Sequence, residues 1–395
     1  MSQPHLHETR NGMGNWAELS SDILGVIVDQ FSAIEDISHF GDVCRSWRSV
    51  SIDKWHFSIV DPWLMLAEKE DDDNRGFYSL STKKVYNLNL PETHGRKCWS
   101  SYGWLITLGL DLEIYLLNPF SRSRVSIRLP HQSTLPNQYN PGVEREYIRR
   151  VFIRKVVLSS RPSKRTTHCE DEGKCLVMGI FSQWRKLAFL RLGDEVWTPV
   201  YTPKGTGIND VVYLNGQFYA IADGGKLVIV DISCPDPKTI EISEPPEDYD
   251  ICAMSYLVES EGELFLLARI LYLGYVQPPK GKKQFVRETD GFNVYKFNFD
   301  DKKWTKVKSL DNRAFFVGTN ASFAIFPTNH SGCESNCIYY TDDDTYSLMT
   351  DSSIKGGAGK DMGVFRMETE ELDDHYDGPN IRTYICAPFW ICPSP

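Results

Sequence analysis

Residues 295–307 read Tyr-Lys-Phe-Asn-Phe-Asp-Asp-Lys-Lys-Trp-Thr-Lys-Val, and this stretch decides the fold class. Its aromatic residues at 295, 297 and 299 alternate with Lys296 and Asn298, which is the period of a half-buried β-strand. Asp300-Asp301 is a turn signal, and a second apolar run begins after it. The stretch therefore predicts a β-hairpin.

The same unit of strand, polar or Gly-containing turn and strand recurs along the chain. Its turns are expected at Leu80, Asn118, Gly193, Asp231 and Asp300, so that successive turns are 38, 75, 38 and 69 residues apart. The short intervals match the ~40–50 residues of a propeller blade, and 75 is close to two blades or to one blade with a long loop. No WD or kelch double-glycine signature is present. The spacing predicts a mainly β protein, a degenerate β-propeller of about six blades, with two unrelated β domains as the alternative.

The N-terminal region has a different period. Residues 16–52 form the only convincing helical region, with a second helix expected from residue 35 and a third after Gly41. Ser20 or Ser21 can cap the first helix, and Asp22 suits the positive end of its dipole. A unit this small cannot bury a stable core alone, so the rest of the chain or a partner must cover its outer apolar surface. We divide the chain into a disordered tail (1–14), this helical module (15–56) and the propeller (57–395).

Composition and charge narrow the class of protein. The chain has 395 residues, 41% of them hydrophobic and 24% charged, which is typical of a soluble globular protein. Its 43 basic and 53 acidic residues leave a net charge of −10, which argues against general binding to nucleic acid or an anionic membrane. We see no secretory signal or membrane span, and we interpret the ten cysteines as reduced thiols. The expected location is the cytoplasm or the nucleus.

Residues 16–24 of the helical module read Trp-Ala-Glu-Leu-Ser-Ser-Asp-Ile-Leu, and Val43-Cys44 and Trp47 follow near its end. With this pattern the module closely resembles an F-box. Ser20 departs from the family pattern, which usually has Pro there; both suit a helix start, but the apolar ring contact with the adaptor is lost. The resemblance implies docking on a Skp-type adaptor, and the alternative is a helical cap packed only on its own propeller. The residues that the resemblance implies for adaptor binding are Trp16, Leu19, Ser20, Asp22, Ile23, Leu24, Ile27, Ile34, Asp36, Val43, Cys44 and Trp47.

The rest of the chain resembles a plant family of F-box proteins whose C-terminal domain, of unknown function, is a degenerate β-propeller. The matching pieces are Leu117–Ser121, Asp210–Ile221, Cys337–Asp342, Gly363–Phe365 and Pro388–Pro393. The resemblance implies a non-catalytic substrate receptor of a ubiquitin ligase, joined through the adaptor to cullin and RING subunits. A ligand-binding or enzymatic propeller, and an F-box protein without a role in ubiquitination, are the alternatives.

The sequence contains no convincing motif for catalysis, nucleotide binding or metal binding, and we expect no cofactor and no metal. Residues 356–360, Gly-Gly-Ala-Gly-Lys, lack the spacing of a P-loop and its following Ser or Thr, so a loop is expected. No Gly-x-Ser-x-Gly elbow or Cys-x-x-Cys occurs. Two sets of three ligands lack a fourth at zinc-finger spacing, and structural thiols are the better interpretation: His330, Cys333 and Cys337, and His168, Cys169 and Cys175.

Two parts of the chain are locally rich in basic residues, although the net charge of the protein is negative. A run between Glu144 and Arg165 is interpreted as solvated strand edges and a loop. Insertions in repeat proteins often gather on the binding face, so two basic insertions are predicted to attract an acidic or phosphorylated segment of the target, and loops that are only solvated are the alternative. Their residues are Arg161, Lys164, Arg165, Lys280, Lys282, Lys283 and Arg287.

A propeller must also close its ring. An open ring would expose two sheet edges, so we predict that residues 381–392 complete a blade with strands near residues 57–67. Trp390 would then be a core residue.

Overall fold

A computed structural model describes most of the chain, and the chain forms two compact units, residues 1–58 and 59–395. No helix among the described residues is long and apolar enough to cross a membrane. The described residues are 16–28, 30–31, 40–41, 43–51, 61–69, 72–120, 125–162, 175–276, 284–328, 331–343, 359–379, 381, 383 and 385–392, with the side chains of 276 and 284–286 left out.

The first unit is helical where it is described. It contains a 3₁₀ turn, η1 (Trp16–Glu18), the helix α1 (Ser21–Val28) and a further helix over residues 45–51. The backbone N–H of Ile23 donates to Oγ of Ser20 at 3.5 Å, so Ser20 caps α1 as expected. Among its described residues, Leu24, Val28 and Phe40 form a buried core.

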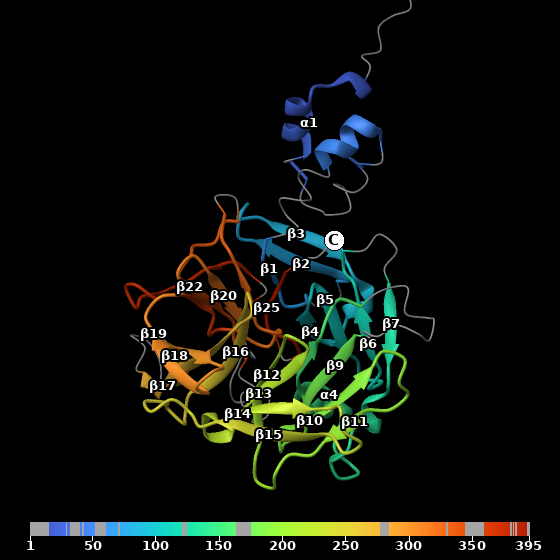
Figure 1. The fold of residues 1–395 in the computed structure, drawn as a ribbon. Coiled ribbons are helices and arrows are strands. Elements are labelled where there is room, and N and C mark those ends of the chain that lie inside the picture. Colours follow the sequence, from blue (N-terminus) through green and yellow to red (C-terminus); the bar gives the residue numbers. More distant parts are fainter. Residues whose placement is uncertain are drawn as a thin grey trace, which may run out of the picture. The chain divides into compact units, whose positions relative to one another are not determined.

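The second unit is a six-bladed β-propeller, as predicted (Figure 1). Its first three blades are four-stranded sheets. They are β25-β1-β2-β3, with β1 (Trp63–Met65), β2 (Asn74–Ser79), β3 (Val85–Asn89) and β25 (Phe389–Ile391); β4 (Lys97–Ser101), β5 (Trp104–Leu108), β6 (Ile114–Leu117) and β7 (Ser126–Leu129); and β8 (Ile153–Leu158), β9 (Leu176–Phe181), β10 (Lys186–Arg191) and β11 (Thr198–Val200).

The last three blades follow in chain order. They are β12 (Ile208–Leu214), β13 (Gln217–Ala222), β14 (Leu227–Asp231) and β15 (Lys238–Ser243); β16 (Met254–Ser260), β17 (Glu263–Val276), β18 (Gln284–Asn298) and β19 (Lys303–Val307); and the sheet β21-β20-β22-β23-β24, with β20 (Ala314–Val317), β21 (Phe323–Ile325), β22 (Cys337–Tyr340), β23 (Gly363–Arg366) and β24 (Leu372–Asp373). Short helical elements lie between strands: η2 (Pro91–Thr93), η3 (Gln132–Thr134), α4 (Arg145–Val151) and η4 (Asp223–Gly225).

The five predicted turns are structurally equivalent. Each one joins the third and fourth strands of its blade, in blades one to five. The 75-residue interval is one blade with a long insertion, which includes α4, and not two blades. The 69-residue interval arises because β17 and β18 form a hairpin of 14- and 15-residue strands. Turn chemistry is local, which is why the sequence could reveal the repeat.

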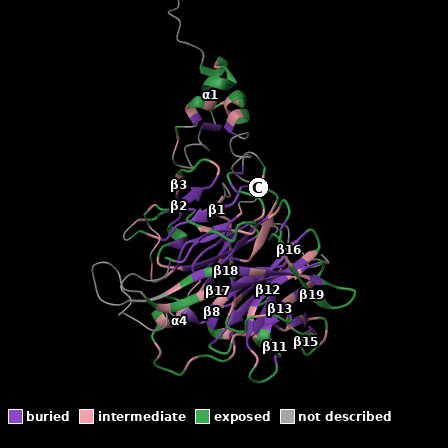
Figure 2. Cartoon of the chain, turned by 90° about the vertical axis from the view of Figure 1, so that its left-hand side faces the viewer, coloured by how far each residue is buried: buried purple, intermediate pink, exposed green. Residues whose placement is uncertain are grey.

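The ring closes through the C-terminal strand, as predicted. Strand β25 pairs antiparallel with β1, with Trp63 opposite Ile391 and Met65 opposite Phe389. Trp390 is fully buried, and its ring packs edge-on against that of Phe316 with the two ring centroids 5.0 Å apart. Figure 2 shows that most residues of the propeller strands are buried, whereas many residues of the connecting loops are exposed. Closure by β25 therefore removes the exposed sheet edges that the first blade would otherwise present.

The innermost strands line the channel of the propeller. They are β25, β4, β8, β12, β16 and β21, one from each sheet (Figure 1). The sixth blade is irregular, because β20 and β22 pair in parallel while the other described pairs are antiparallel.

Candidate functional site

The helical unit presents apolar side chains to solvent. Trp16, Ile23, Val26 and Val43 are each at least half exposed. Ile23 and Val26 are three residues apart on α1, so they lie on one face of the helix. A small helical unit that leaves such groups in water, while its described residues bury only Leu24, Val28 and Phe40 as an apolar core, has a surface suited to a partner.

The predicted adaptor-binding residues divide into two groups. Leu24 is fully buried in the unit's own core, and Leu19, Ile27 and Trp47 pack against that core. The Trp47 ring N–H donates to the backbone oxygen of Trp16 at 2.9 Å, so Trp47 holds the exposed Trp16 in place. These buried residues support the surface, while the exposed ones form it.

The remaining predicted residues of this unit have mixed positions. Ser20 and Asp22 are exposed, and Cys44 is partly buried with its sulfur 3.1 Å from Oγ of Ser46. Ile34 and Asp36 lie outside the described residues. Val26 was missed by the sequence analysis, although its spacing of three from Ile23 could have identified it.

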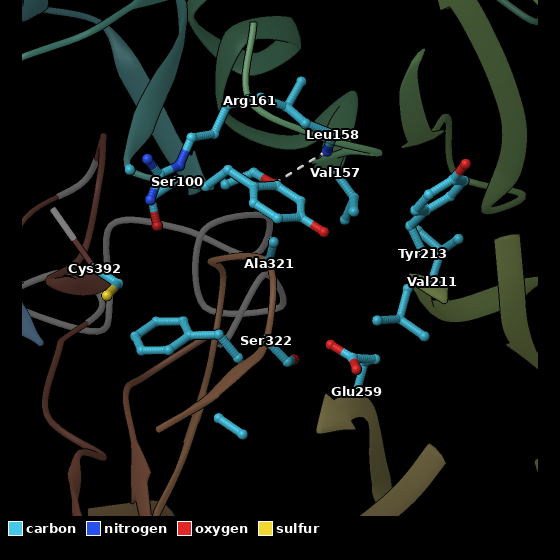
Figure 3. A pocket seen from close by; sticks show the side chains of 16 residues that line it. Ser100, Val157, Leu158, Arg161, Val211, Tyr213, Glu259, Ala321, Ser322 and Cys392 are labelled. Carbon is cyan, nitrogen blue, oxygen red and sulfur yellow. Dashed lines mark hydrogen bonds between the residues drawn. The ribbon is translucent and has the colours of Figure 1, made fainter. Parts of the chain in front are cut away.

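The propeller channel contains a cavity at the end where its innermost strands finish. This end-side cavity has a volume of about 260 Å³ and is lined by the last residues of β4 and β8 and by parts of β12 and β16. Val157, Val211 and Ala321 contribute apolar surface, and Arg161 and Glu259 lie on opposite sides (Figure 3). The cavity therefore offers apolar contact together with one charge of each sign.

A second cavity lies where β8, β12 and β16 begin. This start-side cavity has a volume of about 310 Å³ and is rich in charged groups. The Lys155 ammonium and the Asp210 carboxylate form an ion pair at 2.5 Å, and both side chains are buried. Asp210 also accepts the backbone N–H of Leu257 at 2.9 Å. This ion pair therefore links the innermost strands of three successive blades.

The other carboxylates of the start-side cavity are also paired. Arg185 donates to Asp223 at 2.6 Å and to Oδ1 of Asn209 at 2.9 Å. Asp343 accepts the phenol of Tyr256 at 2.6 Å. Burial raises the pKa of the Asp343 carboxyl, and the nearby Arg269 cation only partly opposes this.

The structure corrects the interpretation of the basic run as solvated edges and a loop. Arg149 lies on α4 and Lys155 on β8, and each is only 6% exposed. Buried charges persist where partners satisfy them, and here the partners are the Gly95 carbonyl oxygen and Asp210. A basic residue on a strand is not necessarily solvated when the next blade supplies a carboxylate.

The predicted basic target-binding residues do not meet at one place. Arg161 lines the end-side cavity, whereas Arg287 donates to Sδ of Met254, which lines the start-side cavity. The two described members therefore lie at opposite ends of the channel. The others lie outside the described residues: Lys164, Arg165, Lys280, Lys282 and Lys283.

The thiols singled out in the sequence are buried side chains. Burial raises the pKa of Cys175, Cys333 and Cys337, the last to about 11. In the part of the chain that the structure describes, no three His, Cys, Asp or Glu side chains are grouped as metal ligands would be. His168, Cys169, His330 and residues 356–358 lie outside that part.

Comparison with known proteins places this geometry in a family. Residues 77–366 match the family model of the KIB1-4 beta-propeller. The F-box protein At5g55150 of Arabidopsis thaliana is 27% identical over 387 residues, which cover 96% of this chain and 97% of that protein. F-box protein SKIP23 of the same plant is 24% identical, with 91% of each chain covered. Among solved structures, YCF48 from Cyanidioschyzon merolae aligns at 12% identity and a TM-score of 0.29 over 59% of this chain and 63% of that one, which carries no inference about function.

Proposed function

This chain belongs to the KIB1-4 beta-propeller family and is similar to plant F-box proteins over nearly its whole length, and from this we propose that it is the substrate-recognition subunit of a Skp–cullin–F-box ubiquitin ligase. The helical unit would dock on the Skp-type adaptor, and the propeller would hold the target protein. We propose the cytoplasm or the nucleus as the place where it acts.

One observation carries the docking half of this proposal. The exposed set Trp16, Ile23, Val26 and Val43 belongs to a unit whose own core is too small to use it. Association is driven most effectively by exposed apolar groups that become buried, with aromatic anchors contributing strongly. Trp16 is such an anchor, and the hydrogen bond from Trp47 holds its backbone.

The propeller half requires no chemistry of its own. A bound target is held near the ubiquitin-charged enzyme that the RING subunit recruits, so its lysines experience a high effective concentration of that enzyme. The basic segments remain proposed target contacts, now as separate patches at the two ends of the channel, with Arg161 at one and Arg287 at the other.

The test is a pair of charge insertions on the exposed face of α1. Ile23→Asp with Val26→Asp would place carboxylates into the proposed adaptor interface, where desolvation of an unpaired charge is costly. Both side chains are at least half exposed in the free chain, so the helical unit should remain folded. We expect the adaptor no longer to co-purify.

A matched control is Val196→Asp, which places the same charge at an exposed apolar position of the propeller. It should leave adaptor binding unchanged. Retention of the adaptor by the Ile23→Asp, Val26→Asp variant at the wild-type level would refute docking through this face.

A further inference from the structure

The start-side cavity is lined by an arginine whose guanidinium forms no hydrogen bond or ion pair with its described neighbours. Arg154 lies near the start of β8, lines this cavity and is partly buried. Its backbone oxygen accepts the ring N–H of Trp99 at 2.9 Å, which fixes the main chain at this point. Across the described residues, no hydrogen bond or ion pair involves its guanidinium, and its Nε is buried without a partner.

The neighbouring carboxylates are not available to Arg154. Asp210 is held by Lys155, Asp223 by Arg185, and Asp343 by Tyr256 and Arg269. Burial lowers the pKa of Arg154 and the positive charge of Arg185 lowers it further, and Tyr139 and Asp223 oppose this shift without cancelling it. The protein thus keeps a guanidinium in a partly desolvated place that is unfavourable for it.

The charged side chains that line this cavity are balanced in number. The cations are Arg154, Lys155 and Arg185, and the carboxylates are Asp210, Asp223 and Asp343. Arg154 is the one of these six whose charged group has no partner among the described residues. The hydroxyl of Thr319, another lining residue, likewise has no partner among the described residues.

We propose that the start-side cavity is a binding site for a phosphate group, with Arg154 as its principal ligand. A planar guanidinium matches two phosphate oxygens with paired N–H donors, and a dianion compensates a desolvated cation better than water does. Lys155 and Arg185 are committed to Asp210 and Asp223, which leaves Arg154 as the cation that contacts the phosphate.

The phosphate has two possible sources. It belongs either to a phosphorylated side chain of a target protein or to a small phosphate compound. The first source rests on the proposed function, because it requires that this chain binds a target protein. The site itself does not depend on that proposal.

The experiment measures thermal unfolding of the full chain. Inorganic phosphate is titrated against chloride and against acetate at constant ionic strength. A ligand that binds only the folded state raises Tm with its concentration, so phosphate should raise the Tm of the propeller and acetate should raise it less. Calorimetric titration of phosphate gives the affinity directly.

Arg154→Gln tests the proposed ligand, and Arg150→Gln is the matched control. Arg150 lies on α4, also has a buried Nε without a partner, and does not line the cavity. Arg154→Gln should weaken phosphate binding about tenfold or more, because charged hydrogen bonds are lost, and Arg150→Gln should leave it unchanged.

A readout without ligand separates binding from a structural role. Since Arg154→Gln removes an unpaired and partly buried charge, it should melt at or above the wild-type Tm in chloride. A Tm clearly below that of Arg150→Gln would assign Arg154 to structure and overturn the proposal. Two further results would overturn the proposal. One is a wild-type Tm that rises no more with phosphate than with chloride or acetate. The other is an Arg154→Gln variant whose Tm rises with phosphate as much as that of the wild type.

A degenerate mixture of phosphoserine peptides, compared with the same mixture after phosphatase treatment, distinguishes the sources. Phosphate-dependent peptide binding that Arg154→Gln removes assigns the site to a phosphorylated target. Binding of inorganic phosphate alone assigns it to a small phosphate compound. The adaptor co-purification test of the Ile23→Asp, Val26→Asp variant is independent of both results, so failure of this site is distinguishable from failure of the proposed function.

Discussion

Arg269 provides the most severe test of how the propeller is held together. It lies on β17 in the fifth blade and is completely buried. Its guanidinium donates to Oδ2 of Asp361 at 2.8 Å, to the oxygen of Thr341 at 3.0 Å and to Oγ1 of Thr289 at 2.7 Å. Burial disfavours its charge, but the oxygens of Tyr256 and the neighbouring carboxylates outweigh this and raise its pKa above the usual value.

Replacing Arg269 by Met removes the cation and leaves the Asp361 carboxylate buried and unpaired. Loss of one partner of a buried ion pair costs about 3–5 kcal/mol of stability. Residues 59–395 form the compact unit that contains Arg269, so the unfolding entropy is taken over this unit. At about 2.1 cal/mol/K per residue, dividing the lost free energy by this entropy gives a decrease in Tm of about 4–7 °C.

The assay is thermal unfolding of the full chain followed by far-UV circular dichroism at a wavelength dominated by strands. Arg128→Met is the control, because Arg128 forms an exposed pair with Glu113 and its loss should barely change Tm. The double variant Arg269→Met, Asp361→Leu should recover part of the loss, since it removes both charges together. A Tm for Arg269→Met equal to that of Arg128→Met would refute the stabilising role assigned to the Arg269–Asp361 pair.

Two further predictions concern the sixth blade and the ring closure. Burial lowers the pKa of His375 to about 3, and both ring nitrogens lack a partner among the described residues, so the folded protein holds it neutral. The unfolded chain takes up a proton on this histidine below pH ~6.5. The stability that is present above that pH is therefore lost as the pH falls toward 3, by about 2 kcal/mol between pH 7.5 and pH 5. His375→Phe should remove this part of the pH dependence in urea titrations at pH 7.5 and pH 5, and an unchanged difference between the two would contradict the assignment. A chain that ends at Gly378 lacks β25 and leaves β1 without a partner on one side, so we expect insoluble protein or rapid limited proteolysis, and a soluble product with the full-length Tm would count against closure by this strand.

Features governed by neighbours in the chain were predictable. The turn at Asp300-Asp301 and its four equivalents depend on local turn chemistry and a period of two, and both appear in the sequence itself. The helix that follows Ser20 depends on its cap and on apolar spacing, and both are present. Closure by residues near Trp390 was also predictable, because an open ring exposes sheet edges whatever its detailed packing.

Features that join blades were decided only by the tertiary structure. Lys155 and Asp210 are 55 residues apart, and Arg269 and Asp361 are 92 apart, so their pairing depends on the packing of neighbouring sheets and leaves no periodic signal. The same applies to Arg154, whose environment consists of residues from β8, β12 and β16 and from connecting segments such as those of Arg185 and Asp223. A charged residue has the same letter whether its partner is water, a carboxylate or an absent phosphate, and only the folded arrangement of the blades distinguishes these cases.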